Sequence, residues 1–229
     1  MRVAIHQPNY MPWPGYFYKI AQSDLFIFLD DAQYTKNSFI NRNRIKTPQG
    51  EHWLTIPVSV SLGQSIRDVS VKSGWAEKHL KTLHQSYSRT PGYKSYIEDI
   101  GTLLNADYAN IADLNIALVE HICGLLGITT PWLRSSELGI LGASDERLAE
   151  IVASLGGDTY LSGFGGANYQ LEQTFSARNI ALETYKFRPP VYKQQWGDFI
   201  PGLSILDVLF HCGEGTMRAI NVASSEDTC

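Results

Sequence analysis

The chain has few cysteines and no long apolar run. Only three of its 229 residues are cysteine, no two of them form a CxxC pair, and an odd number does not suit a disulfide framework. No stretch approaches the roughly 18 apolar residues that a membrane span needs. His6, Gln7 and Pro8 interrupt the first apolar run, which is therefore unlike a signal peptide. These absences predict a cytoplasmic protein in a reducing compartment, without a membrane span.

Basic residues are also scarce. There are 19 Lys and Arg against 23 Asp and Glu, which gives a formal net charge of -4 and does not favour nucleic-acid binding. Hydrophobic residues make up 44% of the chain and charged residues 18%, a composition that excludes intrinsic disorder for its bulk. A chain of this length can bury a full core without disulfides or metals. We expect a single α/β domain over residues 1–229.

The first thirty residues predict a strand–helix–strand unit. The apolar run 3–5 leads into a proline-rich loop, and helix can begin only after the last proline, over 15–22. The run 25–29 is continuously apolar, as is typical of a parallel strand covered on both faces. A second helix-to-strand step follows over 144–161. These patterns predict an α/β fold with a parallel, Rossmann-like sheet.

The rest of the chain carries other patterns. Residues 32–75 have few helix signals and several strand-like pieces, so they predict an irregular β-rich insertion within the domain. Additional helices are expected over 75–87, 96–104 and 114–126. Residues 214–229 show no strong pattern and are expected to form a flexible tail.

The loop after the first strand concentrates polar and aromatic residues among prolines. Ligands of open α/β sheets bind at the carboxyl ends of strands, and the N–H groups of the helix that follows favour an anion. A proline-stiffened turn whose aromatic side chains fill the edge of the core is the alternative interpretation. The candidate ligand-binding or catalytic residues here are His6, Gln7, Asn9, Tyr10, Trp13 and Tyr16.

Two carboxylates, Asp30 and Asp31, follow the second apolar strand. Such a pair can hold Mg²⁺, a ribose hydroxyl or a substrate ammonium. Two close carboxylates in a medium of low dielectric constant can also supply a general acid or base, because one pKa rises. Gln33 and Lys36 follow in the same segment. A solvated strand end with an Asx turn is the alternative.

A basic segment, KNSFINRNRIK over 36–46, contains no acidic residue. Arginine binds phosphate or carboxylate through two parallel hydrogen bonds, and asparagine adds donors. A phosphate-bearing small molecule suits an acidic chain better than nucleic acid does. A solvated basic loop is the alternative. The candidate binding residues are Lys36, Asn41, Arg42, Asn43 and Arg44.

A glycine-rich loop, SGFGG, follows the strand expected over 159–161. Its candidate ligand-binding residues are Ser162, Gly163, Gly165 and Gly166. Glycine lets the backbone approach a ligand closely. The loop matches neither the dinucleotide-binding nor the P-loop pattern, so a structural turn is the alternative. His79 and His84 lie five residues apart and diverge on a helix, so no metal site is predicted.

Four stretches together resemble the WbqC-like protein family. They are HQPNYMPWPGYFYKI, FIFLDDAQYTKNSFINRNRIK, YLSGFGGANY and PPVYKQQWGDFIPGLSILDVLF, in this order between His6 and Gly213. The family is bacterial and is often linked with genes for O-antigen, other surface polysaccharides or modified sugars. The shared pattern that the resemblance implies contains His6, Gln7, Pro8, Tyr10, Trp13, Gly15, Asp30, Gln33, Lys36, Asn41, Arg42, Asn43, Gly163, Gly165 and Gly166.

The first strand–helix–strand unit also resembles that of nucleotidylyltransferases with an HxGH motif. In that group two histidines stabilise the phosphates during transfer. The equivalent stretch here is Trp13-Pro14-Gly15-Tyr16, which has neither histidine. Lys19, Lys36 and Arg42 are candidates to supply the missing positive charge.

These features predict an enzyme of modified-sugar or surface-polysaccharide biosynthesis. It would transfer an acyl or aminoacyl group to an amino sugar, with a nucleotide-linked sugar as the favoured acceptor. The candidate catalytic residues are His6, Asp30, Asp31 and Lys36, and ATP with Mg²⁺ is a candidate cofactor. Nucleotidyl or adenylyl transfer, or ATP-dependent ligation, on the same fold is one alternative. A non-catalytic nucleotide- or sugar-binding protein is another, and a homo-oligomer stays open.

Overall fold

The computed structural model describes residues 1–163 and 172–225, and its centre is a five-stranded sheet. The strands lie in the order β7-β2-β1-β8-β9, and each neighbouring pair is parallel. The mixed α/β fold with a parallel sheet is therefore confirmed, as is the predicted strand–helix–strand unit at the N-terminus. The strands of this sheet are β1 (Arg2–His6), β2 (Leu25–Phe28), β7 (Trp132–Arg134), β8 (Thr159–Ser162) and β9 (Ala181–Thr184).

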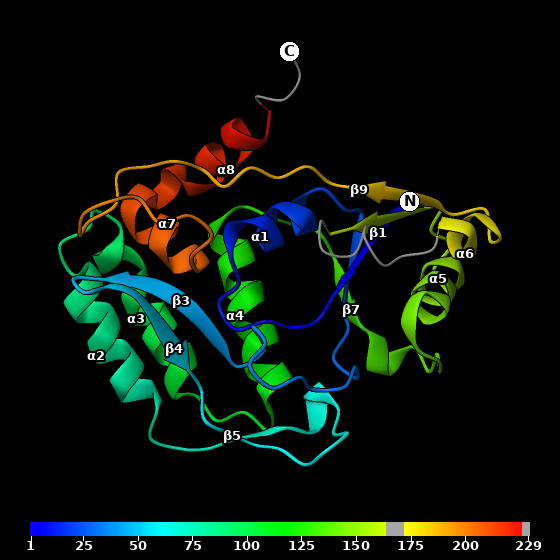
Figure 1. Ribbon diagram of the computed structural model, residues 1–229, viewed down its shortest axis with the longest axis horizontal. Helices are drawn as coiled ribbons and strands as arrows, with labels where there is room; N and C mark the ends of the chain where they lie inside the picture. The colour runs from blue at the N-terminus through cyan, green and yellow to red at the C-terminus, as the bar shows by residue number, and fades with distance from the viewer. Residues whose placement is uncertain (164–171, 226–229) are drawn as a thin grey trace.

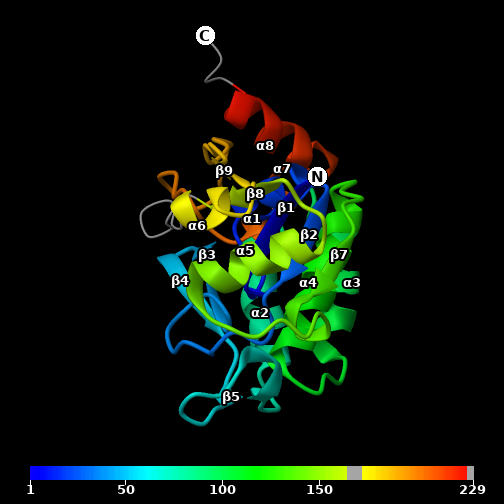
Figure 2. The ribbon, with the colours of Figure 1, turned by 90° about the vertical axis from the view of Figure 1, so that its right-hand side faces the viewer.

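Helices cover both faces of the sheet, because its strands alternate between two apolar clusters. Val3 and Ile5 pack with side chains of α5 and α6, whereas Ala4 packs into the cluster that contains α1, α4 and α7. Figure 2 shows α5 lying across its face of the sheet. The helices are α1 (Pro14–Ala21), α2 (Ala76–Tyr87), α3 (Tyr93–Asn105), α4 (Ile111–Leu125), α5 (Ser144–Ser154), α6 (Glu172–Ser176), α7 (Ile205–Cys212) and α8 (Thr216–Ser225).

Strands and short turns fill the segment between β2 and α2. β3 (Arg42–Thr47) pairs with β4 (Gly50–Thr55) as an antiparallel hairpin, and β5 (Val58–Ser59) pairs with β6 (Ser70–Val71). A single 3₁₀ turn, η1 (Ile66–Asp68), precedes β6. Because β3 begins at Arg42, only the first part of the basic segment 36–46 is a loop.

The hairpin and the helices α2 and α3 form one side of the molecule, and α5 and α6 form the other (Figure 1). The structure differs from the prediction of a tail without a strong element, because α8 forms there. Its Ile220 is fully buried, and α8 contacts α1 and α7, so tertiary packing stabilises a helix that the local sequence indicates only weakly. Residues 226–229 lie outside the described residues. None of the described helices has the length and apolar sequence needed to cross a bilayer.

Candidate functional site

The sheet reverses its direction of growth between β1 and β8. From β1 the chain adds β2 and then β7 on one side, and then returns to add β8 and β9 on the other. In open parallel sheets, ligands bind outside the carboxyl ends of the strands at such a switch point. Ala4 pairs with Leu161, so the next residues along each strand bring the carboxyl ends of β1 and β8 together. His6 and Gln7 therefore lie near Ser162 and Gly163.

A lysine from α1 is buried at this switch point. The Lys19 side chain has only 2% of its surface exposed, and its Nζ donates to the carbonyl oxygen of Ile5 at 2.8 Å. The same ammonium lies 5.9 Å from the centre of the Tyr160 ring. Burial disfavours the charged form and lowers the pKa of Lys19 to about 7. Near neutral pH this lysine can therefore act as a cation or exchange a proton.

His6 ends β1 beside this lysine. Its Nδ1 lies 3.0 Å from the carbonyl oxygen of Gln7, and because a carbonyl only accepts, Nδ1 carries the proton. Burial, together with the positive charge of Lys19, lowers the pKa of His6 to about 4 and outweighs the contact with Gln7. His6 is therefore neutral at physiological pH. In this tautomer Nε2 is an acceptor, and no described residue hydrogen-bonds to it.

Tyr16 holds this arrangement together. Its hydroxyl donates to the Gln7 carbonyl oxygen at 3.0 Å, and its ring packs edge-on against His6 with centroids 4.8 Å apart. Burial raises the pKa of Tyr16, which stays protonated. The three side chains of His6, Tyr16 and Lys19 are thus anchored to backbone carbonyls at the end of β1. We call them, with Gln7, Ser162 and Gly163, the switch-point site.

Sequence reasoning named Lys19 only as one of three candidate charges. The missed signal is that α1 is a mostly buried helix. Six of its eight residues are buried, and Lys19 is one of them. Of the glycine-loop residues, Ser162 is fully buried and Gly163 lies against Tyr185. Gly165 and Gly166 lie outside the described residues.

The two aspartates after β2 are engaged by side chains from later in the chain. Asp30 is fully buried and accepts hydrogen bonds from Ser135 Oγ at 3.3 Å, Ser136 N at 3.1 Å and Ser136 Oγ at 2.8 Å. Asp31 accepts from Ser135 Oγ at 2.6 Å and Arg147 Nη2 at 2.5 Å. Burial alone would raise the pKa of Asp31, but the bonds from Arg147 and Ser135 outweigh it and lower that pKa. These carboxylates connect the end of β2 to the turn η2 (Ser135–Glu137) and to α5.

Asn43 fixes the backbone of the proline-rich loop, and two other candidate residues, Asn41 and Tyr10, make separate buried hydrogen bonds. Asn43 Nδ2 donates to the carbonyl oxygens of Tyr10 at 3.2 Å and Met11 at 2.7 Å, and Asn41 Nδ2 donates to Ile56 O at 2.8 Å. Tyr10 is fully buried, and its hydroxyl lies 2.9 Å from His79 Nδ1.

Three more candidate residues, Asn9, Trp13 and Gln33, have defined surroundings in the structure. Trp13 packs edge-on against Phe187 at 5.0 Å, and Asn9 is buried. Gln33 pairs with Ser65 in an isolated β-bridge. None of these contacts joins Asn9, Trp13 or Gln33 to the side chains of the switch-point site.

The basic residues lie on the segment between β2 and α2. Arg42 and Arg44 share one face of the hairpin with Trp53, and their guanidinium carbons lie 4.3 and 5.8 Å from its ring centre. Arg44 also donates to Glu51 at 2.9 Å and to the Gly202 carbonyl at 3.3 Å. Lys36 is exposed at the edge of a groove beside Arg42.

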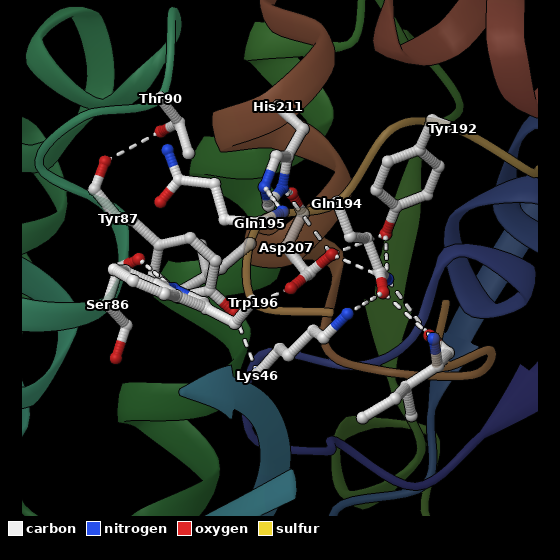
Figure 3. Close-up of polar contacts among 12 residues, drawn as sticks. Lys46, Ser86, Tyr87, Thr90, Tyr192, Gln194, Gln195, Trp196, Asp207 and His211 are labelled. Atoms are coloured by element: carbon white, nitrogen blue, oxygen red, sulfur yellow. Dashed lines mark hydrogen bonds and ion pairs between the residues drawn. The ribbon is translucent and has the colours of Figure 1, made fainter. Parts of the chain in front are cut away.

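The fourth stretch of the sequence pattern forms a buried polar network around Asp207 (Figure 3). The Asp207 carboxylate accepts from Tyr87 OH and Tyr192 OH, each at 2.7 Å, and from Gln194 Nε2 at 3.0 Å. Lys46 Nζ donates to Gln194 Oε1 at 3.2 Å. The network ties α7 and the segment before it to β3 and α2, so these polar residues help to hold the fold together.

Comparison with known proteins identifies the family. The sequence model of the WbqC-like protein family matches residues 7–219. The chain belongs to this family. The uncharacterized protein Rv1507c of Mycobacterium tuberculosis is similar, with 38% identity over 217 residues, which cover 93% of this chain and 94% of that protein. No solved structure gives a significant match. The predicted resemblance to the WbqC-like family is therefore confirmed.

Proposed function

We propose that this WbqC-like protein is an enzyme that forms an amide on an amino sugar, with a nucleotide-linked sugar as the favoured acceptor. The observation that carries the proposal is the pairing of a neutral histidine with a buried lysine at the switch point. Such a pair supplies a base and a cation side by side at the end of β1, and both can assist acyl transfer to an amine. Placement of the protein in modified-sugar or surface-polysaccharide biosynthesis forms part of the same proposal.

In this mechanism the amine nitrogen of the sugar attacks the carbonyl carbon of an activated acyl or aminoacyl donor. A carbon–nitrogen bond forms, the bond to the leaving group breaks, and the leaving group departs with its electron pair. His6 Nε2 accepts the proton that the amine loses, because Nδ1 is held as a donor by Gln7. The Lys19 ammonium stabilises the negative charge that develops on the carbonyl oxygen. An anion near Lys19 raises its pKa and favours the charged form.

Asp30 and Asp31 take a positioning role in this proposal rather than a chemical one. Their oxygens are engaged by Ser135, Ser136 and Arg147, so they do not fit a resident Mg²⁺. No group of three or more His, Cys, Asp or Glu residues gathers within residues 1–163 and 172–225. The proposal therefore includes no step through a resident metal.

Nucleotidyl or adenylyl transfer is the second candidate. The strand order around β1 favours it, because a doubly wound sheet with this switch point suits a nucleotide, and Lys19 would take over the charge of the missing histidines. This second candidate includes the proposal that the fold is nucleotidylyltransferase-like. A binding protein without turnover would use the same site but would not need His6 as a base.

A thermal-shift panel separates these candidates. It contains UDP- and dTDP-linked amino sugars, acyl thioesters of coenzyme A, and ATP with Mg²⁺. A ligand at about 100 times its Kd stabilises the fold by roughly 2.7 kcal/mol, which moves the Tm by several degrees. We expect a shift with a nucleotide-linked amino sugar, and a product whose mass shows one new amide when the donor is added.

Variants then test the roles of the two residues. His6→Gln should lower turnover by about 10²–10⁴-fold, as expected for loss of a general base. His52→Gln, which changes an exposed histidine on β4, is the matched control and should leave turnover unchanged. A shift with ATP alone, accompanied by pyrophosphate release, would replace the amide proposal with nucleotidyl transfer. Ligand binding without any product would leave only a binding protein.

A further inference from the structure

A groove on the insertion gathers positive charge away from the switch-point site. Its volume is about 430 Å³, within the range of small-molecule sites, and Lys36, Arg42 and Lys72 are its three charged lining residues. No carboxylate lines the groove. The chain as a whole carries a net charge of -4, so three cations facing one hollow are a local concentration of positive charge.

The structure holds Arg42 in a fixed position in this groove. Its guanidinium stacks on Trp53 at 4.3 Å, and Nη2 donates to the Asn37 carbonyl oxygen at 2.5 Å. Its Nε is buried and has no hydrogen-bond partner among the described residues. A buried donor without a partner is uncommon in folded proteins, and a bound water, ion or ligand group is one way to satisfy it.

The remaining walls suit a ligand with an organic part. Tyr34 also lines the groove, and burial raises the pKa of its hydroxyl, against the effect of Arg42, so it stays a donor. Val58 and Val60 provide apolar surface. An adjoining hollow of about 330 Å³ shares Tyr34, Lys36 and Val60 and continues the groove toward the fully exposed Leu62.

We propose that this groove, which we call the Lys36–Lys72 groove, binds the diphosphate group of an organic diphosphate ester. The three cations can each contact oxygens of the two phosphoryl groups of a diphosphate, which are more than one phosphate offers, and the adjoining hollow leaves room for the organic part. Nucleoside diphosphate sugars and coenzyme A both contain this group. The site is separate from the amide-forming site, and its test does not depend on turnover.

Calorimetric titration with inorganic pyrophosphate tests the groove. The double variant Lys36→Gln/Lys72→Gln should weaken binding by on the order of tenfold or more per lysine, because a charge-assisted hydrogen bond is lost at each position. Lys78→Gln/Lys81→Gln removes the same charge from exposed positions on α2 and is the matched control, which should bind like the wild type. Circular dichroism melting checks that both double variants fold.

The outcomes are distinct. Equal binding by the two double variants, or no binding by the wild type at millimolar pyrophosphate, overturns the proposal. Binding that is lost in Lys19→Met but kept in Lys36→Gln/Lys72→Gln would place the anion at the switch point and also overturn it. Competition by UDP or by coenzyme A identifies the source of the diphosphate, and failure of both to compete would refute an organic ligand.

Discussion

Replacement of Lys19 by methionine should stabilise the fold at low pH and destabilise it at high pH. The effect of the substitution on the free energy of unfolding should therefore change sign with pH. Burial lowers the pKa of this lysine from 10.5 to about 7. At about 1.4 kcal/mol per pKa unit, holding the charged form in the folded protein lowers the free energy of unfolding by roughly 5 kcal/mol. Because the folded pKa is depressed, the folded protein binds fewer protons than the unfolded chain between about pH 7 and 10.5. Wild-type stability should therefore rise with pH through this window.

The variant lacks this titration but also lacks the hydrogen bond to Ile5. An unpartnered carbonyl costs about 1–3 kcal/mol, so Lys19→Met should be more stable than the wild type by roughly 2–4 kcal/mol below pH 7. Above pH 10.5 the wild-type amine is neutral, and the variant should be less stable by about 1–3 kcal/mol. The two stability curves therefore cross within the window.

Urea unfolding of both proteins at pH 6.5, 8 and 9.5, followed by circular dichroism, measures this difference. Equal m-values would show that the comparison concerns stability alone. A stability difference that does not change with pH would refute the reasoning, since it would mean that Lys19 titrates normally. A variant that gains stability at neutral pH while losing turnover would have the signature of a residue kept for function.

The remaining predictions concern the scaffold and are measured by chemical unfolding. Asp30→Asn should destabilise the fold by about 1–3 kcal/mol, because the Asp30 carboxylate accepts bonds from Ser135 and Ser136, whereas Asp107→Asn at an exposed position should be neutral; equal effects would contradict the structural role. Asn43→Ala should cost about 2 kcal/mol, since the carbonyls of Tyr10 and Met11 lose their donor, and an unchanged midpoint would be inconsistent with this. Gly15→Ala should cost about 1–3 kcal/mol, because a Cβ there would lie 2.6 Å from Trp13 Cη2 and 2.9 Å from Phe187. The control Gly124→Ala in α4 places a Cβ that meets nothing within 4 Å, so it should stabilise the fold slightly. Similar effects at the two glycines would contradict the close packing around Gly15.

The local sequence predicts the elements of the sheet because their signals are local. Residues 25–29 are continuously apolar, and β2 forms there with both faces covered. The strand order is not a local property. The switch point between β1 and β8 depends on a strand that lies more than 150 residues further along the chain, and only the fold shows that the carboxyl ends of the two strands lie side by side.

The roles of individual polar residues depend even more on distant partners. The sequence places Asp30 at a strand end, which suits a ligand site, but its partners Ser135 and Ser136 come from a turn about a hundred residues later. Lys19 illustrates the opposite error. A lysine in a short helix suggests an exposed side chain, yet nearly all of α1 is buried, so the charge of Lys19 is taken out of water.

Hydrogen-bond saturation separates scaffold from site in this protein. Asp30, Asn43 and Asp207 are buried and each makes three hydrogen bonds, as buried polar groups do when their role is to hold a fold together. Lys19 and His6, within the part of the chain that the structure describes, make one each. A lysine that is buried with unused donors lowers stability at neutral pH, and a fold that served only to be stable would place an apolar residue there. This difference in hydrogen bonding, between the three saturated residues and the pair Lys19 and His6, is the strongest physical reason to look for the chemistry of the protein at the end of β1.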